Sequence, residues 1–188
     1  MLQCFVCYDR FTINECAMLS GDLLNKLFME VDFMNSTYKC FVDIRLSGGD
    51  IQFDVSDDNQ LFSFKSGIGF MAIPNFFSVL SSLYRGEITE KQIDCDGNFD
   101  YYLFSSDGTN LFIKHFDHYP EGIFDYQFNL KKYIEAIQIG FQEYLQQLET
   151  EGVLPLKTQE FAHPLGNDVL HAFDDFSSLL NNKKRRDT

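Results

Sequence analysis

Three consecutive segments in the first half of the chain alternate apolar with polar side chains, which is typical of strands buried on one face. They cover residues 38–46, 51–56 and 60–66, and the dipeptides Gly48-Gly49 and Asp58-Asn59 separate them. Both dipeptides suit two-residue hairpin turns. The pattern therefore predicts a three-stranded antiparallel meander with one buried face.

The two turns also fix strand registers, and the two registers agree. The pairs that they predict are Leu46 with Ile51, Ile44 with Phe53, Val42 with Val55, Val55 with Phe62, and Phe53 with Phe64. All of these side chains fall on one face of the meander, because side chains repeat every two residues along a strand. We therefore expect a buried face formed by Ile44, Phe53, Val55, Phe62 and Phe64.

Apolar residues at helical spacing predict four helices, over residues 20–33, 74–85, 130–149 and 168–180. Pro74 is expected at the first helical position of the second helix, with Gly86 just past its end. Asn129 can cap the start of the third helix, the longest, and Gly152 can end it.

Two further strands, residues 99–105 and 110–116, are expected to form a hairpin around Asp107-Gly108. Both faces of this hairpin carry aromatic residues, so we expect it to lie centrally in a sheet or under a helix. Residues 2–8 also read as a buried strand.

These elements predict an α+β fold, in which an antiparallel sheet of meander plus hairpin has helices packed on one face. We expect one domain over residues 1–182, with the helix at 168–180 either docked on the core or forming an appended arm. Residues 183–188 carry four basic residues and one acidic residue and are expected to be a disordered basic tail.

The charge of the chain favours a protein partner over nucleic acid. There are 28 acidic and 15 basic residues, giving a net charge of −13, yet 45% of the residues are hydrophobic and 21 are Phe. Such a chain folds, and its acidic surface repels phosphate. No apolar run reaches the roughly 18 residues of a membrane span, and no signal peptide is evident. With an odd number of cysteines, five, we expect reduced thiols and a cytoplasmic location.

No motif in the sequence indicates a metal site or a cofactor. Cys4 and Cys7 have the CxxC spacing of a zinc site, but no second Cys pair or His pair completes four ligands. We expect buried thiols at these two positions, without zinc or a disulfide. The glycine-rich, nucleophile-elbow and zinc-protease motifs are also missing, so no cofactor is expected.

One cluster of ionisable residues suggests an enzyme as an alternative. The register expected around Asp107-Gly108 places Asp100 opposite His115, with Asp117 on the same face. Such a cluster orients an imidazole for acid–base chemistry or binds a metal. The simpler interpretation is a cross-strand charge pair that raises the pKa of His115.

The outer face of the meander and the later loops are rich in acid. The predicted register sets Asp43 opposite Asp54, and like charges in this position destabilise a hairpin. A basic partner would relieve that cost, and Asp54 and Asp57 are expected to be exposed. The alternative is that the charge serves solubility alone. The residues predicted to bind such a partner are Asp43, Asp54, Asp57, Asp58, Asp94, Asp96, Asp107, Asp117 and Glu121.

The chain resembles the small cytosolic immunity proteins of bacterial toxin systems. It is acidic, rich in Phe and Tyr, and carries a long amphipathic helix after the hairpin Ser106-Asp107-Gly108-Thr109. The resemblance implies one-to-one binding that blocks a toxin domain, commonly a basic nuclease, and it assigns no functional residue. Besides the enzyme, a second alternative is a regulatory or structural subunit that uses the final helix.

Overall fold

The computed structural model describes residues 39–47, 49–94, 100–118, 121–156 and 165–184. The strand predicted at 2–8 and the helix predicted at 20–33 lie outside these residues. So do Cys4, Cys7 and Asp96.

The predicted meander is present as a three-stranded antiparallel sheet. Its strands follow in chain order, β1 (Phe41–Ser47), β2 (Asp50–Ser56) and β3 (Leu61–Ser66). Every predicted pair is confirmed, including Ile44 with Phe53 and Phe53 with Phe64. The predicted core face is also confirmed, since Ile44 is 7% exposed and the other four side chains are fully buried.

A second antiparallel sheet contains the predicted hairpin at its centre. Its strands are β4 (Glu90–Asp94), β5 (Tyr101–Ser106), β6 (Asn110–His118) and β7 (Glu121–Asn129), in that order. The pair β5–β6 corresponds to the predicted hairpin, and its aromatic residues on both faces fit the central position. The outer strands β4 and β7 were not predicted, because most of their side chains are exposed and they lack a clear apolar alternation.

The register predicted for the β5–β6 hairpin is wrong by two residues. Tyr102, not Asp100, lies opposite His115. The connection is a four-residue turn over residues 107–110, and the Asp107 carboxylate accepts hydrogen bonds from the backbone N–H groups of Thr109 and Asn110 at 2.8 and 2.7 Å. A two-residue shift keeps every side chain on its face, so the faces of the hairpin were predicted correctly.

Three helices complete the described fold: α2 (Gly69–Arg85), α3 (Leu130–Thr150) and α4 (Asn167–Lys184). The start of α3 is confirmed, since the Asn129 side chain accepts from the Lys132 N–H at 3.1 Å. The ends of α2 and α3 are confirmed as well, since Gly86 and Gly152 follow them with φ of 72° and 73°. The start predicted for α2 is wrong, because the helix begins at Gly69 and Pro74 lies inside it. Burial of Ala72 and Ile73 against the core outweighs the one backbone hydrogen bond that Pro74 removes.

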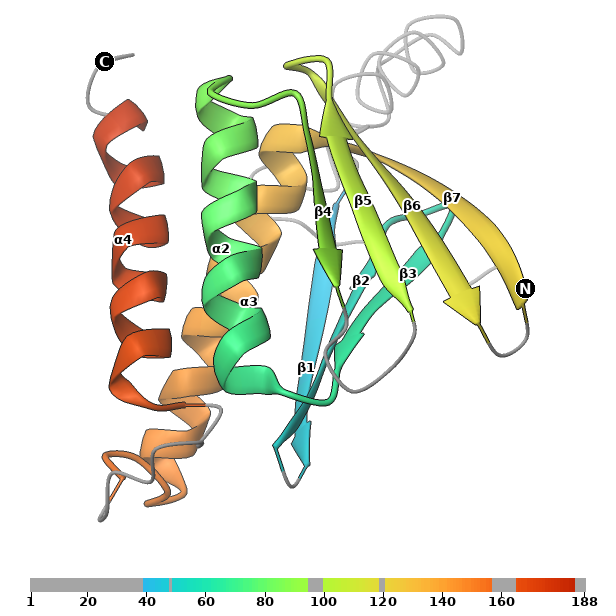
Figure 1. Ribbon diagram of the computed structural model, residues 1–188. Coiled ribbons are helices and arrows are strands. Elements are labelled where there is room, and N and C mark those ends of the chain that lie inside the picture. The colour runs from blue at the N-terminus through green and yellow to red at the C-terminus, as the bar shows by residue number, and fades with distance from the viewer. Residues whose placement is uncertain (1–38, 48, 95–99, 119–120, 157–164, 185–188) are drawn as a thin grey trace, which may run out of the picture. The chain divides into compact units, whose positions relative to one another are not determined.

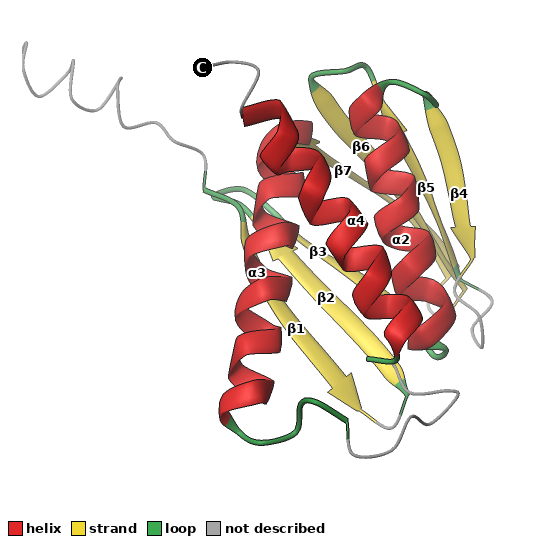
Figure 2. Cartoon of the chain, turned by 90° about the vertical axis from the view of Figure 1, so that its left-hand side faces the viewer, coloured by secondary structure: helices red, strands yellow, loops and turns green. Residues whose placement is uncertain are grey.

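The helices lie together on one side of the strands, as Figures 1 and 2 show from perpendicular directions. Helix α3 crosses β1 at Gly140, where a Cβ atom would lie 2.7 Å from the Cβ of Val42. Helix α4 packs on the core, and its Phe173 ring centroid lies 4.7 Å from that of Phe141 on α3. The structure therefore shows the predicted α+β fold with its helices on one side.

In the described part of the chain no strand of one sheet pairs with a strand of the other, and hydrogen bonds from side chains connect the two sheets. The Tyr102 hydroxyl of β5 accepts from the Lys65 N–H at 3.1 Å and donates to the Ser63 carbonyl at 3.3 Å. The Gln60 side-chain amide donates to the Gln127 carbonyl on β7 and accepts from the Gln127 N–H. These bonds occupy backbone groups at the outer edges of β3 and β7, which would otherwise be unpaired.

Candidate functional site

Two turns of the same construction lie beside one cavity. In the first, the Asp57 Oδ1 accepts from the N–H groups of Asn59 and Gln60 at 2.8 and 3.0 Å, and Oδ2 accepts from the Gln60 amide at 3.2 Å. In the second, Asp107 makes the same three bonds with Thr109 and Asn110. We call residues 57–60 and 107–110 the twin turns. In each turn the aspartate fixes the orientation of the side-chain amide at the fourth position, which is Gln60 in the first turn and Asn110 in the second.

The cavity has a volume of about 540 Å³ and is lined mainly by carboxamides. It lies between the twin turns, the end of β7 and the start of α3. Its lining residues are Cys40, Asp57, Asn59, Gln60, Asn110, Gln127, Phe128, Asn129 and Lys132. This cavity was not predicted from the sequence, because its lining comes from segments that are far apart in the chain.

The chemistry of the cavity suits binding better than nucleophilic catalysis. Burial and the nearby negative charge of Asp57 raise the pKa of the Cys40 thiol to about 11, so the thiol stays protonated at neutral pH. Asp57 and Lys132 bring opposite charges, and the carboxamides bring both donors and acceptors. Such a lining can hydrogen-bond the backbone or the polar side chains of a bound protein.

Three of the predicted binding residues, Asp57, Asp58 and Asp107, gather at the twin turns. Asp58 and Asp107 are exposed, and Asp57 is half-buried. The hydrogen bonds from Asn110 and Thr109 lower the pKa of Asp107, so this carboxylate stays ionised at neutral pH. The two turns therefore present a stable cluster of negative charge beside the cavity.

Three others, Asp94, Asp117 and Glu121, lie at the opposite end of the four-stranded sheet from the turn at 107–110. The ladders place Asp94 beside Tyr101, Asp117 beside Gly122, and Glu121 beside His118. Asp94 and Glu121 are exposed, whereas Asp117 is half-buried. We call these three residues the strand-end acids, and they form a second acidic region apart from the twin turns.

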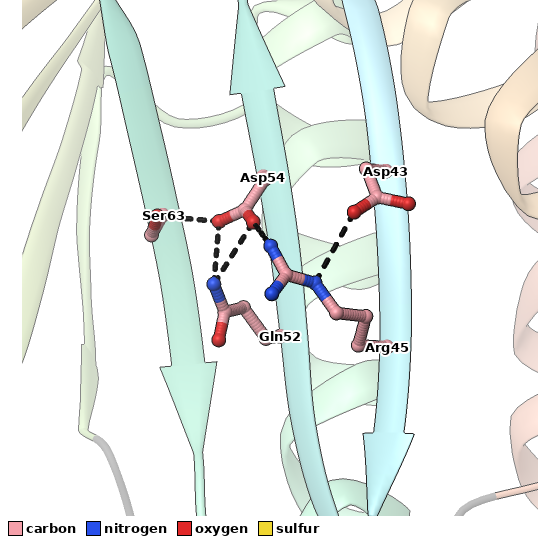
Figure 3. Close-up of polar contacts among 5 residues, drawn as sticks. All are labelled: Asp43, Arg45, Gln52, Asp54 and Ser63. Carbon is pink, nitrogen blue, oxygen red and sulfur yellow. Dashed lines mark hydrogen bonds and ion pairs between the residues drawn. The ribbon is translucent and has the colours of Figure 1, made fainter.

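The last pair, Asp43 and Asp54, does not form the repulsive contact that was predicted (Figure 3). Arg45 lies between them, with its Nε 3.1 Å from Asp43 and a second guanidinium nitrogen bonded to Asp54. Gln52 donates to Asp54 at 2.7 and 2.9 Å, and the Ser63 hydroxyl bonds it as well. The repulsion is thus offset within the chain.

Asp54 is also buried, with 8% exposure, so the expectation that it is exposed is wrong. Burial alone would raise the pKa of Asp54, but the hydrogen bonds from Ser63 and Gln52 and the positive charge of Arg45 outweigh it and lower the pKa. The sequence indicated part of this arrangement, the pairing of Arg45 with Asp43, since Arg45 lies two residues after Asp43 and thus on the same face of β1.

The Asp100, His115 and Asp117 cluster does come together, although not in the predicted register. The His115 Nε2 lies 4.0 Å from the Asp100 Oδ2, which is too long for a hydrogen bond, and Asp100 instead accepts from the His118 N–H at 2.9 Å. The imidazole packs on the Tyr102 ring at 4.5 Å between centroids. None of the three residues lines the cavity beside the twin turns.

The raised pKa predicted for His115 is wrong. Burial lowers the pKa of His115 below its ordinary value of 6.5, and this effect exceeds the opposing influence of Asp117 and Asp100. The neutral imidazole is therefore the form that the fold favours.

We expect His115 to make the protein less stable as the pH falls below about 6.5. The unfolded chain takes up a proton at the ordinary pKa, whereas the folded chain does so only at lower pH, so acid favours unfolding. Urea unfolding at several pH values between 7.5 and 5.5 should show a smaller loss for His115→Gln than for wild type. His171→Gln, at an exposed position of α4, is the control. Equal losses in His115→Gln and wild type would contradict this account.

Within the described ranges, no three His, Cys, Asp or Glu side chains converge as metal ligands. No described helix combines the length and the apolar character needed to cross a membrane. Comparison with protein-family models, curated proteins and solved structures finds no match for this chain.

Proposed function

We propose that the protein is a non-catalytic module that binds a basic protein partner. The observation that carries this proposal is the set of exposed carboxylates at the twin turns and the strand end. Asp58, Asp94, Asp107 and Glu121 form no ion pair with Lys or Arg of the described chain. A cationic partner would offset the mutual repulsion of these groups.

Other acidic residues contrast with these four. Asp43, Glu87 and Asp125 each lie within 4.0 Å of an Arg or Lys nitrogen. Glu143 and Asp174 on the helices also form no ion pair among the described residues, so ion pairing alone does not single out the two regions. What favours the twin turns is their place beside the carboxamide cavity, which supplies directional hydrogen bonds.

The identity of the partner follows from the resemblance noted in the sequence. On this proposal the protein acts in the cytoplasm as an immunity protein, and binds one copy of a cognate toxin domain with a basic surface. The alternative of a subunit that uses its final helix has less support. The apolar residues Val169, Phe173 and Phe176 of α4 are buried in the core and are not available to a partner.

Charge reversal at Asp58 and Asp94 tests the proposal. Both are exposed and neither lies on β7. The partner would be isolated from the native host with the tagged full chain, and association would then be measured with purified proteins. We expect Asp58→Lys/Asp94→Lys to slow association about tenfold or more at low salt, with the difference shrinking as salt rises.

The matched control is Glu143→Lys/Asp174→Lys, which makes the same change in net charge at exposed positions of α3 and α4. We expect this control to change the rate less than about threefold, because it leaves both acidic regions intact. If both double variants slow association equally, the effect belongs to net charge and the proposed binding regions are wrong.

A further inference from the structure

Among the described residues, strand β7 lies at the edge of its sheet, and backbone groups in its first half have no partner. In the described chain it pairs only with β6. At Gln127 the N–H and the carbonyl point away from β6, since both bond the Gln60 side chain. Backbone direction repeats every two residues in an antiparallel ladder, so the same groups of Ile123 and Asp125 point outward too. No hydrogen bond reaches these groups of Ile123 or Asp125 from the described residues.

The same half of β7 exposes large apolar side chains on both faces. Ile123 is 62% exposed and Phe124 is 42% exposed. They lie between the exposed carboxylates of Glu121 and Asp125, and Asp125 lies 3.9 Å from Lys114 in an exposed pair. An edge with unpaired backbone and apolar side chains is a template for another strand. We call residues 121–125 the open edge.

We propose that the open edge receives an extended basic segment of the partner protein as an added strand of the four-stranded sheet. This inference rests on the proposed function and names the contact through which binding occurs. Glu121, Ile123 and Asp125 share one face, so an added strand with Lys or Arg on that face would meet both carboxylates. Its residues on the other face would be apolar and would cover Phe124.

Charge disfavours a second copy of this chain as the added strand. An antiparallel pair of open edges centred on Ile123 would set Glu121 of each copy opposite Asp125 of the other. Like charges directly opposite one another destabilise a strand pair, and here two such contacts would form. A basic strand would instead place positive charges opposite both carboxylates.

The position of the open edge also fits the two acidic regions. It begins at Glu121, one of the strand-end acids, and the Gln60 side chain blocks the edge two residues beyond Asp125, at Gln127. Gln60 and Gln127 both line the carboxamide cavity. A segment that follows the edge from Glu121 would thus be directed toward the cavity beside the twin turns.

Amide exchange in the full chain tests the proposal with a defined probe. The probe is a blocked peptide of about seven residues that alternates Lys with Val, and the matched peptide has Glu in place of Lys. We expect saturating basic peptide to slow exchange of the Ile123 and Asp125 amides about tenfold or more, measured by NMR. The acidic peptide is expected to leave both rates unchanged.

Two substitutions separate the backbone contribution from that of the side chain. Ile123→Pro removes an outward N–H and leaves the β6 ladder intact, and we expect at least about tenfold weaker binding of the basic peptide. Ile123→Ser keeps the N–H and removes apolar contact, and remains informative if the Pro variant fails to fold. Its matched control is Ile139→Ser, at a 55% exposed position of α3, which should bind like wild type.

Several results would overturn the proposal. These are no peptide binding, binding that leaves the Ile123 and Asp125 amides unprotected, and equal protection by the acidic peptide. Protection that rises with protein concentration alone would assign the edge to a second copy. The proposed function is tested separately, because Asp58 and Asp94 lie off the open edge. If their reversal weakens the native partner while the edge amides stay unprotected, only the added-strand inference fails.

Discussion

Replacing Phe53 with Ala is expected to lower the unfolding free energy by about 3–5 kcal/mol. The ring is fully buried, and its centroid lies 5.4 Å from that of Phe76 on α2 and 6.0 Å from that of Phe141 on α3. Removing it leaves a cavity where the meander meets both helices. Urea unfolding, followed by circular dichroism, measures the change.

The control for this substitution is Phe41→Ala, which removes the same ring from a 61% exposed position of β1. A change within about 0.5 kcal/mol is expected there, because little apolar surface leaves the core. Similar losses in the two variants would show that the buried face of the meander is assigned incorrectly.

Replacing Asp54 with Lys is expected to lower the unfolding free energy by about 2–4 kcal/mol. The substitution removes the acceptor for Arg45, Gln52 and Ser63 and sets a second positive charge beside the guanidinium. The low pKa of Asp54 means that its carboxylate stabilises the fold at neutral pH. That contribution is lost as the pH falls below the ordinary value of 3.8 toward the folded pKa.

Asp43→Lys is the matched control, because Asp43 pairs with the same Arg45 but is exposed. A loss of less than about 1 kcal/mol is expected for this exposed pair. Chemical denaturation of both variants at neutral pH makes the comparison. If Asp54→Lys is as stable as Asp43→Lys, the buried network contributes no more than a surface ion pair.

The expected loss of stability in Asp54→Lys also limits how partner binding can be tested. Lys at Asp54 would weaken binding by unfolding the meander, whatever the role of the acidic surface. Asp58 and Asp94 avoid this difficulty, since both side chains are exposed. The repulsion predicted between Asp43 and Asp54 no longer supports a basic partner, and the exposed acids Asp58, Asp94, Asp107 and Glu121 carry that argument instead.

Elements whose signals are local could be predicted from the sequence. The meander was predicted with its registers because two short turns and a period of two residues specify which side chains share a face. The end of α2 and the start of α3 were predicted because Gly86 and Asn129 act on their own neighbours. The β5–β6 register was missed because Asp107 was taken as a central residue of the turn, whereas it is the first residue, with its carboxylate bonded to the N–H groups of Thr109 and Asn110 as that of Asp57 is to Asn59 and Gln60.

The burial and grouping of the predicted site residues could not be read from the sequence. Asp54 became buried because Arg45, Gln52 and Ser63 converge on it from three strands. The acidic residues separated into two regions, and the carboxamide cavity formed, where segments distant in the chain meet. Strand β7 could not be read from its exposed side chains, because its place was set by pairing with β6. Each of these features depends on contacts between separate elements, which periodicity and turn chemistry do not encode.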